Sequence, residues 1–197
     1  MDNYEYIISS LPTLNPEVRP GEPSRDSILD FIKEQLSPKD NATVDLLLRG
    51  HDESQLGEAF YQEALSHPDR FIREYFRFDL QLRNAKVRFL NKALGREEKQ
   101  DIFREPEEPF EEAARTQAAL ATTDILARER ALDDIRWEKI SALNLFDYFN
   151  LDTILGFIAR YRITRRWAVL DEQAGRELFH QLVKEVRGTF KGVEYNA

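Results

Sequence analysis

The sequence predicts an all-α protein: an irregular bundle of about eight helices around one long central helix. Three observations support this prediction. Residues 69–94 contain neither Gly nor Pro and carry apolar side chains at helical spacing. Helix start and stop signals recur along the chain. A strand-like pattern occurs only at residues 4–11, with no convincing second strand to pair with it. We expect residues 1–197 to form a single helical domain.

The N-terminal segment is the one candidate for extended structure. Residues 4–11 (YEYIISSL) are rich in β-branched and aromatic residues, which favour a short strand or an extended arm. The next twelve positions hold four of the eight prolines together with Gly21, so residues 12–23 are predicted to form a loop.

Three short helices are expected next. The first starts at a capping Ser24 and runs to Leu36. The second starts at Ser37, which precedes a proline at the first helical position, and ends at Gly50. The third covers residues 53–65.

The long helix at residues 69–94 has an apolar arc broader than the stripe of a usual surface helix, so other helices must surround it. Asp79, Arg83 and Lys86 fall within that arc. Asp79 and Arg83 are four residues apart and can pair, and we predict a substantially buried ion pair. The remaining, solvated side is expected to carry Arg73, Arg77, Gln81, Asn84, Arg88 and Asn91.

Residues 96–112 form the most acidic stretch, with eight acids against three bases. Pro106 and Pro109 interrupt any helix there. We expect an exposed acidic hinge or loop. Its simplest role is that of a solvated linker, and the alternative is an interaction loop.

Four further helices are predicted in the C-terminal half. They cover residues 110–131, residues 133–148 with Phe146 on the apolar side, residues 151–168, and residues 172–187 behind a capping Asp171.

A group of arginines ends the helix at 151–168. Four of them occur within seven residues of a chain whose net charge is −8: Arg160, Arg162, Arg165 and Arg166. The planar guanidinium group suits carboxylates at interfaces. One interpretation is that these arginines pair with acids of the same chain, for example in the 96–112 segment. Another, which we adopt as the prediction, is a docking surface for an acidic partner. A third is a phosphate or nucleic-acid site.

Composition argues against most catalytic chemistry and points to no cofactor or metal. The chain has no Cys and three His, and it lacks a phosphate-binding glycine loop and a nucleophile elbow. Glu177 and His180 have the Glu-x-x-His spacing of di-iron sites, but no second such pair exists. The acidic balance disfavours nucleic-acid binding, and no apolar run reaches the length of a membrane span. We therefore expect a protein that is not an enzyme.

Several segments resemble one bacterial family of unknown function. The stretches are Asn3-Tyr4-Glu5-Tyr6 leading to Leu11-Pro12, Phe78 through Asn84 closing at Gly95, and Leu155 through Trp167 followed by Leu170-Asp171. Members of that family are typically encoded beside subunits of rotary A/V-type ATPases. The resemblance implies a role similar to the C or d subunit, a helical connector between the central rotor shaft and the membrane ring. It supplies no catalytic residues.

The expected function is therefore a non-enzymatic assembly or connector subunit of an A/V-type ATPase. Its partners would be the central-stalk and membrane-ring subunits. It would be cytoplasmic and peripherally associated with the membrane through them. The alternative is an unrelated soluble helical adaptor or regulatory protein that binds an acidic partner.

Overall fold

The computed structural model describes residues 4–17, 27–146, 148–170, 177 and 183–184. Its long helices are α5 (Arg70–Ala93), α7 (Ile125–Leu143) and α8 (Leu151–Ala168). The shorter ones are α1 (Tyr4–Ser10), α2 (Ser27–Gln35), α3 (Pro38–Arg49), the 3-10 turn η1 (Glu53–Gln55), α4 (Glu58–Leu65) and α6 (Ala113–Leu120). No strand occurs in this described part of the chain, so the predicted all-α class is confirmed.

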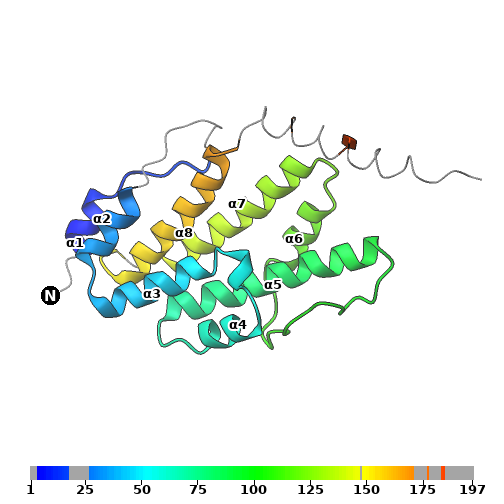
Figure 1. Cartoon of the computed structure of the whole chain (residues 1–197), viewed down its shortest axis with the longest axis horizontal. Coiled ribbons are helices and arrows are strands. Elements are labelled where there is room, and N and C mark those ends of the chain that lie inside the picture. Colours follow the sequence, from blue (N-terminus) through cyan, green and yellow to red (C-terminus); the bar gives the residue numbers. More distant parts are fainter. Residues whose placement is uncertain (1–3, 18–26, 147, 171–176, 178–182, 185–197) are drawn as a thin grey trace, which may run out of the picture.

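Two helices organise the bundle. The central helix α5 contacts α4, α6, α7 and α8, while α8 contacts α1, α3, α5 and α7. In Figure 1, α5 runs along the molecule below α7 and α8, with α1 and α2 at the left end and α6 between α5 and α7. Most of the buried apolar side chains form one cluster, and a second cluster lies where α5, α6 and α7 meet.

Helix ends follow the sequence where a capping side chain marks them. Ser37 accepts a hydrogen bond from the Asp40 amide and starts α3 with Pro38, and Gly50 ends that helix. Asp69 caps α5 in the same way, by accepting from the Ile72 amide. Gly95 follows α5 with φ +65°, the left-handed conformation expected of a glycine at a helix end.

The predicted strand or extended arm at residues 4–11 is wrong, because Tyr4–Ser10 form helix α1. Ile7 is fully buried there, and α1 packs against α8. The Tyr4 hydroxyl donates to the Asp40 carboxylate at 2.9 Å. Burial against neighbouring helices outweighs a weak local preference for β structure.

Three predicted helix boundaries also change. The 53–65 helix is divided into η1 and α4 by Leu56 and Gly57. The chain breaks between α6 and α7 at residues 121–124, where Asp124 caps α7 by accepting from the Ala127 amide. That helix ends at Leu143, five residues before the predicted end. Most of the predicted 172–187 helix, like its Asp171 cap and the Ser24 cap, lies outside the described residues.

The acidic 96–112 segment is mostly exposed, yet α5 holds its backbone through side chains that were predicted to face solvent. Asn84 and Asn91 are buried. Asn84 Nδ2 donates to the Arg104 carbonyl at 2.7 Å, and Asn91 Nδ2 donates to the Gln100 carbonyl at 2.8 Å. The placement of both asparagines on the solvated side was therefore wrong. Their amides satisfy a loop backbone that lies along the helix.

Candidate functional site

Helices α5, α7 and α8, together with the chain that follows α3, enclose a cleft of about 540 Å³, within the size range of ligand pockets. Its charged lining comes from elements far apart in the sequence. The cationic members are Arg83, Lys86, Arg136, Arg162 and Arg166. The carboxylates are Glu53, Asp79, Asp101 and Asp133.

One wall of the cleft is the α5 pair that the sequence singles out. Arg83 Nε donates to Asp79 Oδ2 at 2.7 Å, and the Tyr61 hydroxyl donates to the same oxygen at 2.8 Å. The Asp79 side chain is 7% exposed and that of Arg83 is 32% exposed, so the carboxylate is buried and the guanidinium is half-buried. Periodicity along α5 does not reveal Tyr61, because this residue belongs to α4.

Burial and the Asp79 carboxylate shift the pKa values of Arg83 and Tyr61. Burial disfavours the charged guanidinium, but the adjacent Asp79 carboxylate outweighs that effect and raises the pKa of Arg83. Burial, reinforced by Asp79, raises the pKa of Tyr61. The arginine is therefore a permanent cation and the tyrosine a neutral hydrogen-bond donor.

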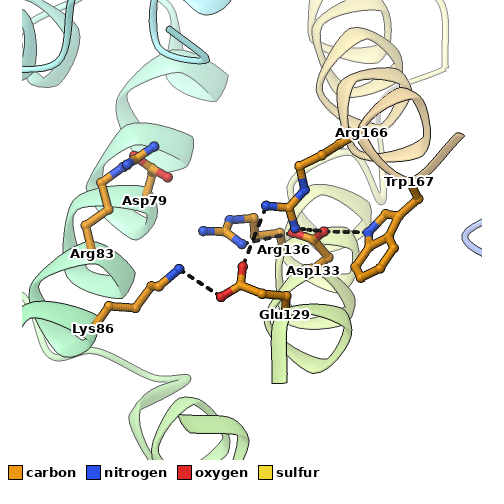
Figure 2. A network of polar contacts seen from close by, with 8 residues as sticks. All are labelled: Asp79, Arg83, Lys86, Glu129, Asp133, Arg136, Arg166 and Trp167. Carbon is orange, nitrogen blue, oxygen red and sulfur yellow. Dashed lines mark hydrogen bonds and ion pairs between the residues drawn. The ribbon is translucent and has the colours of Figure 1, made fainter. Parts of the chain in front are cut away.

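The opposite wall is a network centred on Asp133 (Figure 2). This carboxylate is buried and accepts from Arg136 Nη1 at 2.9 Å and from the indole nitrogen of Trp167 at 2.7 Å, and it also pairs with Arg166. Glu129 lies one helical turn earlier on α7. It pairs with Lys86 of α5 at 3.2 Å and with Arg166 of α8 at 3.6 Å. The network joins the three long helices.

Sequence reasoning missed this network, because it placed Asp133 at a helix start. A usable signal was present: an acid between Leu132 and Ile135, three residues before Arg136. An acid on the buried face of a helix requires partners. The contacts with Arg166 and Trp167 span more than thirty residues and cannot be obtained from spacing along one helix.

The four arginines predicted as one docking surface point to different sides of α8. Arg160 lies over the Trp137 ring at 5.7 Å, and burial lowers its pKa. Arg162 and Arg166 line the cleft, whereas Arg165 does not belong to its lining. Arg166 pairs with acids of its own chain, as the alternative interpretation proposed, but those acids lie on α7 rather than in the 96–112 segment.

Two polar groups of the cleft stand out. Within the described residues, Arg162 has no hydrogen-bond or ion-pair partner, and the buried Nε2 atom of His51 has no hydrogen bond. Burial, followed by the nearby charge of Arg162, lowers the pKa of His51 to about 4. The histidine is therefore neutral at physiological pH. Buried polar groups of native proteins usually have a partner, so the buried His51 Nε2 is an exception, and the half-buried Arg162 is a cation without a countercharge among the described residues.

A second surface lies in the connection between α7 and α8, which we call the 145–149 loop. Its described side chains are large, apolar and more than half exposed: Leu145, Phe146, Tyr148 and Phe149. Phe146 was predicted to lie on the apolar side of a helix, but it is 85% exposed. That prediction was wrong because α7 ends before it is reached.

Hydrogen bonds hold both ends of the 145–149 loop. Asn144 Nδ2 donates to the Asp152 carbonyl at 2.6 Å, and Asn150 caps α8 by accepting from the Thr153 amide at 3.1 Å. Arg70 of α5 donates to the Leu143 carbonyl at 3.0 Å and pairs with the Asp152 carboxylate at 3.1 Å. The aromatic side chains are thus presented from a backbone that is anchored to three helices.

Two further features of the described residues bear on function. They contain no group of His, Asp or Glu side chains arranged to hold a metal ion. None of their helices combines the length and the apolarity that crossing a bilayer requires.

Comparison with known proteins identifies a family. The family model described as "Protein of unknown function (DUF2764)" matches residues 49–189, which include α4 to α8 and the whole cleft lining. No curated protein and no solved structure matches the chain.

Proposed function

Because this chain belongs to the DUF2764 family of proteins of unknown function, we propose its role from its own geometry: a non-enzymatic docking subunit that works through protein–protein contact. The proposed partner is a subunit of an A/V-type ATPase. In this proposal the chain is a cytoplasmic connector between the central rotor shaft and the membrane ring.

The observation that carries the docking role is the 145–149 loop. Its four described apolar side chains are between 60% and 85% exposed. Single exposed apolar residues are common on protein surfaces, whereas contiguous apolar patches mark interaction sites. Aromatic side chains are also the usual energetic anchors of interfaces. The anchored ends of this loop reduce the conformational entropy lost on binding.

The choice of partner rests on the resemblance of the chain's N-terminal, central and C-terminal segments to a family encoded beside A/V-type ATPase subunits. A connector needs a helical body and a binding surface, and no catalytic residues. In this proposal the 145–149 loop takes over the docking role that the sequence assigned to the arginines of α8. Arg166, in particular, is engaged by Asp133 and Glu129 within the chain.

The test is affinity purification of the full chain from native membranes, with mass spectrometry of the captured proteins. Wild type should capture A/V-type ATPase subunits, and the double variant Phe146→Ser with Phe149→Ser should lose them. The matched control is Ile125→Ser with Leu126→Ser, which removes two exposed apolar side chains at the other end of α7. The control should retain capture.

Circular dichroism melts separate lost docking from lost folding, because all three proteins should melt at similar temperatures. Retained capture by the Phe146/Phe149 variant would contradict the assignment of the docking surface. Absence of ATPase subunits from the wild-type sample would contradict the proposed partner, whatever other proteins are captured.

A further inference from the structure

We propose that the cleft between α5, α7 and α8 is a binding site for a small phosphate-type anion, with Arg162 as its main contact. This site is separate from the 145–149 loop, and the proposal does not depend on the identity of the docking partner.

Arg162 provides the first argument. It is half-buried, it lines the cleft, and it lacks a hydrogen-bond or ion-pair partner within the described residues. The guanidinium group has five N–H donors in a fixed planar arrangement. A cation removed from much of its solvent is destabilised unless it is paired. An anion that enters the cleft would supply the missing countercharge.

The other cations of the cleft provide the second argument. Arg136 projects from α7, and Lys86 projects from α5 toward α7, so that positive groups approach the cleft from opposite sides (Figure 2). The hydrogen bond from Arg136 to Asp133 uses only one of the arginine's donors. Donors on three different helices therefore remain available to one ligand.

Two of the lining carboxylates already have donors of their own. Asp79 already accepts from Tyr61 and Arg83, and Asp133 accepts from Arg136, Arg166 and Trp167. The lining has five cations and four carboxylates, and Glu129 beside it pairs with two of those cations, Lys86 and Arg166. Arg162 is the cation that these carboxylates leave without a partner, so an anion is expected to bind there rather than along the whole cleft.

The arrangement favours a tetrahedral anion over a carboxylate. A carboxylate is satisfied by one guanidinium fork, whereas a phosphate can accept hydrogen bonds from several directions at once. His51 is neutral, so it adds no charge to the cleft. The cleft also includes Leu56, Tyr75 and Phe103, which leave an apolar wall for the remainder of a phosphorylated small molecule.

The test is isothermal titration calorimetry of the full chain with inorganic phosphate and with pyrophosphate, at constant ionic strength. Wild type should show saturable binding. Arg162→Leu should bind phosphate at least about tenfold more weakly than wild type, because one charge-assisted contact is lost. Arg96→Leu is the matched control, since it removes the same charge from an exposed position just beyond α5. This control should bind as wild type does.

Lys86→Gln should also weaken phosphate binding, because it removes a second cation of the cleft. It therefore tests the proposal even if Arg162→Leu does not fold. Absence of saturable binding to wild type, or equal binding to all the variants, would overturn the proposal. Binding of a glutamate-rich peptide in place of phosphate would also overturn it, in favour of an acidic protein segment as the occupant. The Phe146/Phe149 variant should still bind phosphate, which separates failure of this site from failure of the docking surface.

Discussion

At the scale of single residues, Asp133 connects two helices through three partners. Its carboxylate is buried and receives hydrogen bonds from Arg136 on its own helix and from the Trp167 indole on α8, in addition to the pair with Arg166. Removal of the carboxylate leaves Arg136 and the Trp167 indole without this acceptor, while Arg166 keeps its pair with Glu129. The consequence for stability is larger than that of a surface ion pair.

Asp133→Ala should lower the free energy of unfolding by about 3–5 kcal/mol, because it leaves buried donors and a largely buried cation unpaired. The matched control is Arg115→Ala, which breaks the exposed pair with Glu138 and should cost less than about 1 kcal/mol. Urea unfolding of both variants measures the difference. Similar midpoints for the two would show that the Asp133 network contributes little.

His51 leads to a prediction about pH at the same scale. Its pKa is about 4 in the folded protein, against an ordinary value of 6.5, because of burial and the charge of Arg162; Asp79 opposes this shift, while Arg136 and Arg83 reinforce it. Between these two pH values the unfolded chain binds a proton that the folded chain does not. Stability is therefore present above pH 6.5 and is lost as the pH falls toward 4.

Between pH 7 and pH 4.5 this effect should remove about 2 kcal/mol from the free energy of unfolding of wild type. His51→Gln cannot take up the proton and should lose less stability over the same interval by about that amount. Urea unfolding of both proteins at the two pH values measures the difference, and shared carboxylate titrations cancel. An equal loss in both proteins would contradict the depressed pKa.

At the scale of elements, the end of α3 approaches α5 closely enough to exclude a side chain. A Cβ atom on Gly50 would overlap the ring of Phe76 and would lie 3.0 Å from that of Phe60. Those two rings pack edge to face, with centroids 5.0 Å apart, and both are buried. The sequence marks Gly50 as a helix end, and the structure adds a packing requirement.

Gly50→Ala should therefore destabilise the protein by about 1–3 kcal/mol, the usual effect of overpacking a core, although alanine is the better helix former. Gly57→Ala is the control, because a Cβ atom there meets nothing within 4 Å. It should destabilise the protein by no more than about 1 kcal/mol, the usual effect of alanine at an N-cap, because Gly57 is the N-cap residue of α4. Thermal unfolding of both variants is a sufficient measurement, and equal melting temperatures would show that the Phe76 ring moves aside without strain.

At the scale of the whole molecule, a charged cleft lies next to the apolar clusters of the bundle. Phe78 and Leu82 of α5 pack into the cluster with α6 and α7, while Asp79 and Arg83, on an adjacent face of the same helix, line the cleft. One helix thus serves the core and the candidate site at once. This arrangement explains why its apolar arc contains charges that a simple core helix would not carry.

The sequence by itself determined the helical class and those helices whose ends carry a strong local signal. Ser37, Asp69 and Asn150 cap α3, α5 and α8 as side chains within three residues of the amides that they bind. The four-residue spacing of Asp79 and Arg83 is equally local, and their side chains meet at 2.7 Å. Such features depend on backbone geometry within one or two turns, so a linear pattern contains the necessary information.

Only the tertiary structure decided the rest. Residues 4–10 become helical because Ile7 is buried, and Asn84 and Asn91 are buried because the 96–112 backbone needs their amides. Contacts such as that of Asp133 with Trp167 join residues that are 34 positions apart, and their formation depends on how three helices pack. Side-chain pairing across helices is set by the packing of the whole bundle, which the periodicity of a single segment does not contain.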